Sequence, residues 1–358
     1  MSSSVLPKLT AYMRHIMSTH GLMLVISTLL LGSLSSNAAR GGDSNMNILL
    51  GAVKAAGGRL DVNEKGLITR VSFRDSPVSD QIVAELAVLT SLQSLSFEEC
   101  NQFSGAGFKQ YPARSPLRAV VFTNCQALSD ECFHELARIR SLESVILENC
   151  NGVTGDGIEE LSKTRLLRFK LVVGDKNQSS LVEKVGGLKS IRELTVKDRS
   201  VSPLLTDAVM SKWSGLRAVQ KMVLFAPAVT GKAFGTLSDL AQLETLLVSS
   251  ESLDDAAAFL PASWKNLHYI GFWGGNSFSD KGLARLAKVE TLNRVYLAGL
   301  ERITQSGIQR LIAIKSLEKV GVYDCEMIDA KAAAELEICF GRTKLSWTIT
   351  GKNMPYWD

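Results

Sequence analysis

From residue 68 onward, apolar and polar positions follow a pattern that recurs about every 25 residues. The segments 91–100, 116–125 and 141–150 share the frame LxxLxLxxC, in which L is any large apolar residue. The intervals are 24 or 25 residues, except for one of 28 residues. Because chance does not hold such a register through eleven steps, the chain is predicted to consist of internal repeats. The first apolar position falls at Ile68, Leu92, Leu117, Leu142, Leu166, Ile191, Val219, Leu243, Leu267, Leu292 and Leu317, with a degraded copy at Arg342.

Each unit is predicted to contain one strand followed by one short helix. Apolar positions such as Val145 and Leu147 alternate with polar ones, which is the period of a half-buried strand. An apolar loop residue and then a residue that can cap a helix follow the strand. Short helical patterns come next, as in residues 130–139, where Cys132, Leu136 and Ile139 share one face. The predicted caps are Ser79, Ser104, Ser129, Thr154, Thr230, Asp254, Ser279, Thr304 and Asp329.

The irregular interval of 28 residues lies between Ile191 and Val219. Extra residues inside the strand would turn its buried face to solvent, so they are predicted to enlarge the following loop or helix. Trp213 is therefore predicted to lie in or beside that helix.

The length of the unit and its frame resemble the leucine-rich-repeat family, specifically the cysteine-containing and ribonuclease-inhibitor-like classes of secreted bacterial type. The resemblance covers about residues 60–350. It implies an α/β solenoid, a leucine-rich-repeat horseshoe with a concave parallel sheet and convex helices. It also implies that the ninth position of the unit turns inward and caps the loop after the strand.

The predicted organisation is a single solenoid between two covers, since a terminal repeat leaves an apolar face open. Residues 59–350 form the solenoid, and two apolar runs around residues 63–66 predict a hairpin that seals its first repeat. Leu345 and Trp347 continue the strand pattern at the other end, before a tail over 351–358. Residues 40–58 are a preamble, and no segment is left for a second domain.

The first 39 residues differ from the rest of the chain. They contain no acidic residue, carry Lys8 and Arg14, and include an apolar run over 21–34 followed by small polar residues. This order is typical of a secretory signal peptide, with cleavage after Ala38 or Ala39. A retained anchor is the alternative, but a bilayer span needs ~20 apolar residues. The chain is thus expected to be exported to the periplasm, the cell envelope or the extracellular space, with no stable membrane span after cleavage.

Composition and charge narrow the function classes. Hydrophobic residues make up 46% and charged residues 21%, as in a globular protein, and the net charge of +4 is too weak to predict a nucleic-acid partner. Motifs for nucleotide-binding loops, serine nucleophiles, zinc proteases and dinucleotide binding are missing from the sequence. His134, beside Glu135 on a helix, is expected to be a surface residue. We therefore expect no catalytic residues, no cofactor and no metal site.

Four cysteines, Cys100, Cys125, Cys150 and Cys325, occupy the ninth position of their units. A ladder of buried free thiols is the favoured interpretation, because a free cysteine packs as a small hydrophobe. A disulfide between stacked neighbours remains the alternative in an oxidising compartment. The two others, Cys132 and Cys339, are expected in the helix core.

If the fourth and sixth unit positions point into the core, the third, fifth and seventh point outward on the concave side. In the first six repeats the residues at these positions are largely small or charged: Arg70, Ser72, Arg74, Ser94, Ser96, Glu98, Ser144, Glu148, Arg168, Lys170, Glu193 and Lys197. From Val219 onward they are Lys221, Val223, Phe225, Leu247, Tyr269, Trp273, Arg294, Tyr296, Lys319 and Tyr323.

The second group predicts a binding surface, since exposed aromatics with arginine are the composition of interaction hot spots. Its predicted contact residues are Phe225, Leu247, Tyr269, Trp273, Arg294, Tyr296, Lys319 and Tyr323. The alternative is that the rings cover one another or the sheet without a partner. The sequence thus predicts a non-enzymatic scaffold for a protein or peptide partner. Carbohydrate or envelope-polymer binding by the aromatic rings is the second hypothesis, and an enzyme of unrecognised type the third.

Overall fold

A computed structural model of the protein describes residues 42–341 and 344–348. The strands are β1 Arg59–Val62, β2 Ile68–Arg74, β3 Ser94–Glu98, β4 Ala119–Thr123, β5 Ser144–Glu148, β6 Arg168–Val173, β7 Glu193–Asp198, β8 Lys221–Phe225, β9 Thr245–Ser249, β10 Tyr269–Trp273, β11 Arg294–Ala298, β12 Lys319–Tyr323 and β13 Lys344–Thr348. The α-helices are α2 Gly42–Ala55, α3 Asp80–Glu85, α4 Asp130–Leu136, α5 Gly155–Leu161, α6 Ser179–Glu183, α7 Asp207–Met210, α8 Lys232–Gly235, α9 Asp280–Leu286, α10 Gln305–Gln309 and α11 Ala330–Phe340. The 3-10 helices are η2 Leu86–Val88, η3 Ala106–Gln110, η4 Lys184–Gly187, η5 Asp255–Ala258 and η6 Arg310–Ala313.

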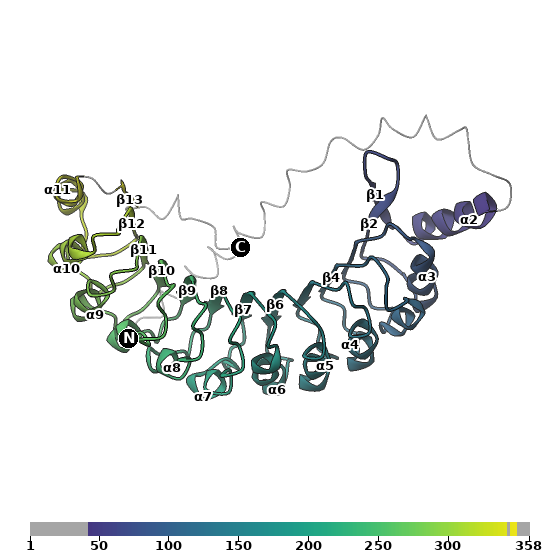
Figure 1. The fold of residues 1–358 in the computed structure, drawn as a ribbon, viewed down its shortest axis with the longest axis horizontal. Helices are drawn as coiled ribbons and strands as arrows, with labels where there is room; N and C mark the ends of the chain where they lie inside the picture. Colours follow the sequence, from purple (N-terminus) through teal and green to yellow (C-terminus); the bar gives the residue numbers. More distant parts are fainter. Residues whose placement is uncertain (1–41, 342–343, 349–358) are drawn as a thin grey trace. The chain divides into compact units, whose positions relative to one another are not determined.

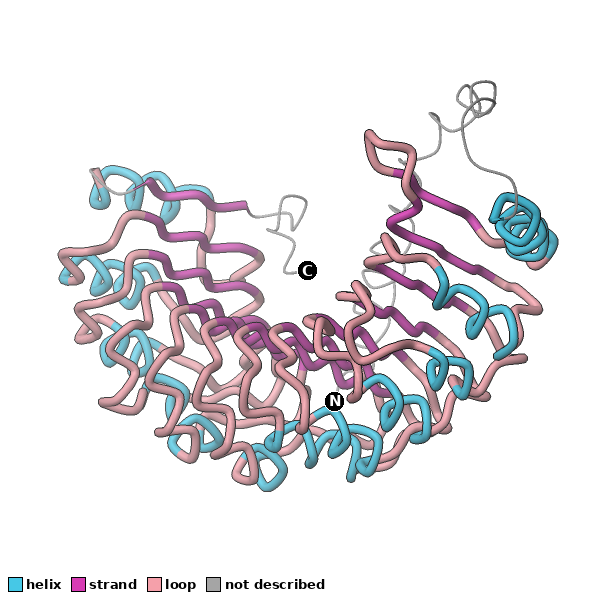
Figure 2. The backbone as a smooth tube through the Cα atoms, turned by 45° about the vertical axis from the view of Figure 1, so that its right-hand side comes forward, coloured by secondary structure: helices cyan, strands magenta, loops and turns pink. Residues whose placement is uncertain are grey.

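The strands form one sheet in chain order, from β1 to β13, among the described residues. The β1 strand runs antiparallel to β2, and each later strand is parallel to the one before it. Within the compact unit that begins at Leu49, the strands line the inner side of an arc and the short helices its outer side (Figures 1 and 2). This is the leucine-rich-repeat horseshoe that the repeat pattern predicts.

The core lies between the sheet and the helices and is built by the inward positions of the strands. In β3, β4 and β5, buried residues alternate with half-buried ones, as the frame predicts. Phe73, Phe97 and Phe122 occupy the same sixth position in neighbouring repeats, and their rings stack at centroid distances of 5.7 and 5.6 Å. The repeat register therefore places equivalent side chains against one another through the interior.

In seven of the eleven units, the eighth position turns the chain out of the sheet in a left-handed conformation. It has positive φ at Asp75, Glu99, Asn124, Asn149 and Asp324, and Gly274 and Gly299 hold the same place in their units. Asn, Asp and Gly tolerate this conformation best, because a short polar or missing side chain avoids the clash that most residues meet there. The turn directs the ninth position back into the solenoid.

Aspartates at the first position of the helices join neighbouring repeats. Asp130 accepts hydrogen bonds from the backbone N–H of Thr154 at 2.8 Å and from its hydroxyl at 2.6 Å. Asp255 and Asp280 make the same pair of contacts with Ser279 and Thr304, the N-cap residues of the next repeat. Asp207 makes it with Thr230, which the sequence predicted as a cap but which precedes the N-cap Gly231. The prediction of Ser104 as a cap was wrong in the same way, since the N-cap of η3 is Gly105. Each aspartate thus satisfies helix N-terminal donors of the following unit.

The loop before α7 holds the three extra residues of the irregular repeat. The Asp198 carboxylate, at the end of β7, accepts hydrogen bonds from the backbone N–H groups of Ser200, Leu204 and Leu205, which orders this longer loop. Trp213 follows α7, is fully buried, and donates its Nε1–H to the Val182 carbonyl at 3.0 Å. Both the site of the insertion and the predicted position of Trp213 are confirmed.

At the N-terminal end, β1 and β2 form the predicted hairpin, and Asn63 accepts hydrogen bonds from Lys65 and Leu67 in its turn. The preamble also contributes buried residues, since it contains α2, whose Leu49 and Val53 are buried. The sequence reasoning foresaw no helix there. The predicted signal peptide over 1–39 and the tail over 351–358 lie outside the described residues.

Candidate binding surface

The predicted outward positions of the C-terminal strands share common rows across the sheet. Tyr269 of β10 lies opposite Arg294 of β11, which lies opposite Lys319 of β12. The fifth positions align Leu247, Gly271, Tyr296 and Gly321, and the seventh positions align Ser249, Trp273, Ala298 and Tyr323. The register predicted for the second half of the chain is therefore correct, and these strands are neighbours on the inner side of the arc (Figure 1).

Four of these side chains form what we call the concave aromatic cluster, Tyr269, Trp273, Tyr296 and Tyr323. The Tyr296 ring is 5.3 Å from that of Tyr269 and 6.0 Å from that of Tyr323, measured between centroids, and it is parallel to the Tyr323 ring within 1°. The Lys319 ammonium lies 5.4 Å from the centre of the Tyr296 ring. The rings therefore pack against one another along the sheet.

Small residues between the aromatic positions make this packing possible. A Cβ atom at Gly321 would lie 2.5 Å from Cδ1 of Tyr296 and 2.6 Å from Cε2 of Tyr323. In the seventh-position row, Ala298 separates Trp273 from Tyr323. Adjacent strands are only ~4.8 Å apart, so large side chains fit side by side only where their neighbours are small. The sequence reasoning missed these small residues, although their alternation with large ones was visible in the aligned repeats.

The cluster is less exposed than the sequence suggested. Tyr296 is 5% exposed, Tyr323 6% and Leu247 3%, whereas Tyr269 and Trp273 are half-buried. The expectation that all of these outward side chains stand open to solvent was wrong for the first three. The reason is lateral packing on the sheet, which is what the alternative interpretation described, and it leaves Trp273 and Tyr269 as the partly accessible rings.

The other predicted contact residues are placed as follows. Arg294 is exposed and Lys319 half-buried, both next to the concave aromatic cluster. Phe225 is half-buried on β8, where the Lys197 ammonium lies 4.6 Å from the centre of its ring. Phe225 and Leu247 thus continue the surface toward the middle of the solenoid.

The ladder cysteines are buried and free, as predicted for Cys100, Cys125, Cys150 and Cys325. The Cys125 thiol lies 3.5 Å from both the Phe97 and the Thr123 carbonyl oxygens, to which it can donate. Burial, with a smaller effect of Cys125, raises the pKa of Cys100 to about 11. Burial also raises the pKa of Cys325 to about 11. These two thiols therefore stay protonated near neutral pH and are poor nucleophiles.

The two remaining cysteines differ from each other. Cys132 is buried in α4, as expected for a helix core residue, whereas Cys339 of α11 is exposed. The expectation was therefore wrong for Cys339, because this residue points away from the buried face that Leu336 and Phe340 form on the same helix.

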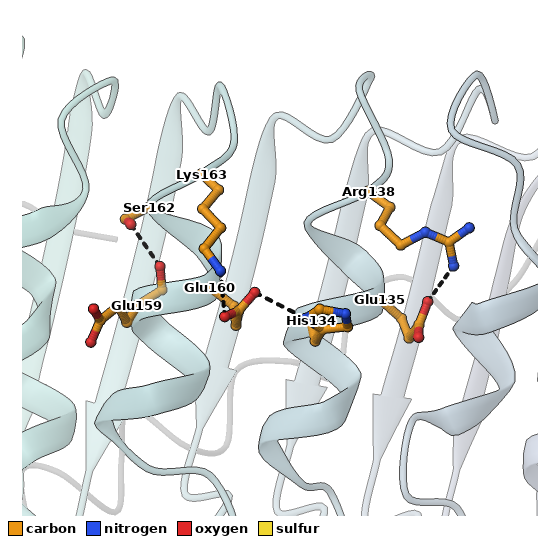
Figure 3. Close-up of polar contacts among 7 residues, drawn as sticks. All are labelled: His134, Glu135, Arg138, Glu159, Glu160, Ser162 and Lys163. Carbon is orange, nitrogen blue, oxygen red and sulfur yellow. Dashed lines mark hydrogen bonds and ion pairs between the residues drawn. The ribbon is translucent and has the colours of Figure 1, made fainter.

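The residues around His134 form a surface network of ion pairs. His134 Nδ1 lies 3.1 Å from Oε2 of Glu160, whose other oxygen is 2.6 Å from the Lys163 ammonium (Figure 3). Hydrogen bonds from Lys163 and His134 hold the pKa of Glu160 below its usual value. Glu135 pairs instead with Arg138, two residues after the end of its helix. His134 is thus an exposed partner of an acidic residue in the next repeat, as the sequence suggested.

Within residues 42–341 and 344–348, no group of three or more His, Cys, Asp or Glu residues is arranged to hold a metal ion. No helix in the same part of the chain has the length and apolar character needed to cross a bilayer.

Comparison with known proteins supports the fold. No protein-family model matches the sequence, and no curated protein matches it. A chain of the Rad7–Elc1 complex from yeast is similar in structure, with a TM-score of 0.51 and 12% identity over 99% of this chain and 97% of that chain. An internalin from Listeria monocytogenes has a TM-score of 0.45 and 9% identity over 84% of this chain and 94% of its own. At these identities the likeness concerns the leucine-rich-repeat fold alone.

Proposed function

We propose that the protein is a non-enzymatic recognition scaffold that binds a partner protein or peptide on its concave C-terminal surface. The observation that carries the proposal is the concave aromatic cluster, in which Gly321 and Ala298 leave room for the rings. A cluster packed in this way is rigid before a partner arrives, so little conformational entropy is lost on binding. Half-buried Trp273 and Tyr269, next to exposed Arg294, have the composition of a hot spot.

We also propose a repeat class for the protein and its export from the cytoplasm. We place it among exported leucine-rich-repeat proteins of the cysteine-containing, ribonuclease-inhibitor-like class and of bacterial type. The repeated ninth-position cysteines and the signal-like sequence over 1–39 support this placement. The mature chain is expected to begin at Ala39 or Arg40, which mass spectrometry of the exported protein can check. An intact Met1 on the exported protein would contradict it.

Carbohydrate binding is the weaker candidate, because a sugar stacks on an open ring face. Tyr269, Tyr323 and Lys319 lie around the Tyr296 ring, which is only 5% exposed. A protein partner can instead use ring edges, the half-buried Trp273 and the nearby cations together.

The test compares Trp273→Ala with Ser96→Ala, a change at an outward serine of the N-terminal half. Truncation of a hot-spot aromatic typically costs ~2 kcal/mol or more, about a thirtyfold loss of affinity, so we expect Trp273→Ala to lose partner capture from a cell-envelope extract. Ser96→Ala is expected to capture as wild type does. Melting curves must show both variants folded. Capture by Trp273→Ala equal to wild type would remove this surface as the site.

A further inference from the structure

The outward positions of the C-terminal strands carry positive charge and no carboxylate. From β8 to β12, the charged residues in the third, fifth and seventh positions are Lys221, Arg294 and Lys319. The register continues this row to Lys344 of β13. The remaining outward positions of β8 to β12 are aromatic, aliphatic, small or hydroxyl-bearing. This stretch of the concave face therefore attracts anions.

The N-terminal strands show the opposite arrangement, since most of their outward cations have an acidic neighbour. Arg74 forms an ion pair with Glu98 on the adjacent strand, at 2.5 Å, and Lys170 with Glu148, at 3.1 Å. Arg70 lies 3.7 Å from Asp61 of the hairpin. Lys221 of β8 also has an acidic neighbour, since Glu193 of β7 lies opposite it. The concave cations beside the aromatic cluster, Arg294 and Lys319, have none on the adjacent described strands.

Arg294 and Lys319 lie directly opposite each other on neighbouring strands. Like charges opposite each other in a sheet repel, which lowers stability unless an anion lies between them. Among the described residues, neither side chain forms an ion pair with an acidic residue. The ammonium of Lys319 is oriented by the Tyr296 ring, 5.4 Å from its centre, so the cation and the cluster form one surface.

We propose that the segment bound on this surface is an acidic peptide, whose carboxylates contact Arg294 and Lys319 while an apolar side chain packs on Trp273 and Tyr269. The inference rests on the proposed function and specifies its partner. Two strand spacings, ~10 Å from β10 to β12, correspond to about three residues of extended peptide. Alternate side chains of such a peptide point the same way, so Asp or Glu at every second position reaches the basic row.

A nucleic acid fits the surface less well than a peptide. Recognition of single strands relies on bases stacked on open aromatic faces, and Tyr296 and Tyr323 are almost fully buried. The net charge of the whole chain is only +4, and the N-terminal concave face is rich in carboxylates. The cations are thus local and adjacent to apolar side chains.

The experiment selects binders from a displayed library of random twelve-residue peptides on the full chain. Selected peptides are then measured by fluorescence anisotropy against wild type, Arg294→Glu with Lys319→Glu, and Trp273→Ala. The control is Arg165→Glu with Arg168→Glu, which changes the net charge equally at exposed residues of the N-terminal half. A single-stranded oligonucleotide of similar length serves as the competing probe.

We expect the selected peptides to be enriched in Asp and Glu. They should bind the variant Arg294→Glu with Lys319→Glu at least tenfold more weakly than wild type, and bind the control variant as tightly as wild type. Affinity should fall as salt rises. Neutral or basic peptides that need Trp273 but not the cations would overturn this inference and leave the proposed function standing. Peptides that need neither would overturn both. An oligonucleotide that displaces the peptides and binds more tightly than they do would also overturn the inference, in favour of a nucleic-acid partner.

Discussion

Both halves of the solenoid bury aromatic side chains inside, as Phe272 shows at the sixth unit position of β10, but among the described strands only those of the C-terminal half also carry them on the concave side of the sheet. In the N-terminal half, phenylalanines fill the sixth strand position and stack inside, as Phe73, Phe97 and Phe122 do. In the C-terminal half, tyrosines and a tryptophan occupy outward positions and pack on the concave face. Inward rings add to the core of every fold of this type, whereas a ring on the concave face has no role in joining sheet to helices. The proposed binding surface rests on this difference.

The burial of the fifth unit position, which lies between the two other outward positions of each strand, also differs between the two halves. In β3, β4 and β5 the fifth position is half-buried, whereas in β8, β9 and β10 it is buried. The fifth residue is also apolar in β4 and β5, where it is Val121 and Ile146, so the difference in burial comes from the surrounding side chains. The C-terminal concave face is therefore an apolar surface with cations beside it, and the N-terminal one a hydrated surface with ion pairs.

The largest effect is expected from a charge placed inside the N-terminal half. In Cys125→Asp, a buried carboxylate would replace a thiol whose neighbours are the Phe97 and Thr123 carbonyl oxygens. We expect a loss of about 4 kcal/mol or more in the free energy of unfolding, measured by urea denaturation. In the control Cys125→Ser, a hydroxyl can donate to the same carbonyls, so about 1–2 kcal/mol is expected. Equal tolerance of both substitutions would place Cys125 outside the interior.

A medium effect is expected from overfilling the concave aromatic cluster. In Gly321→Val, the new side chain meets the rings of Tyr296 and Tyr323 and must displace them. We expect a loss of about 1–3 kcal/mol of stability and a change in the near-ultraviolet circular dichroism of the tyrosines. Gly235→Ala is the matched control, because a Cβ there meets no atom within 4 Å. A silent Gly321→Val would show that the rings do not pack across this glycine.

The smallest effect is expected from removing the charge of an aspartate at the first position of a helix, a contact that both halves of the solenoid share. Burial opposes the charge of Asp80, but hydrogen bonds from Ser104, Gly107 and Gly105 outweigh it and hold its pKa below the usual 3.8. Asp80 therefore stabilises the fold above that pH, and its contribution is lost as the pH falls through the lower folded pKa. We expect Asp80→Asn to cost about 1 kcal/mol at neutral pH.

The pH dependence provides the check on this assignment. The stability difference between wild type and Asp80→Asn, from urea denaturation at several pH values, is expected to be constant above about pH 5 and to shrink below 3.8. A difference that persists unchanged in acid would mean that the Asp80 charge is not what holds the next repeat.

The repeat pattern by itself determined most of the fold. A frame that returns every 24 or 25 residues admits one strand and one helix per unit. Its period of two within the strand separates inward Val145 and Leu147 from outward neighbours. The placement of the extra residues outside the strands, and of Trp213 beside the helix, followed from the same register. These features are local, so one unit of sequence contains the information for them.

Only the tertiary structure decided how the outward side chains meet. Alignment placed Tyr296 and Tyr323 on the concave face, but their burial depends on ring stacking between adjacent repeats and on the space left by Gly321. The contact between Asp130 and Thr154 likewise joins residues 24 positions apart. The exposure of Cys339 depends on which face of α11 packs inward. Such contacts join different repeats or elements, and the hydrophobic pattern of a single unit does not contain them.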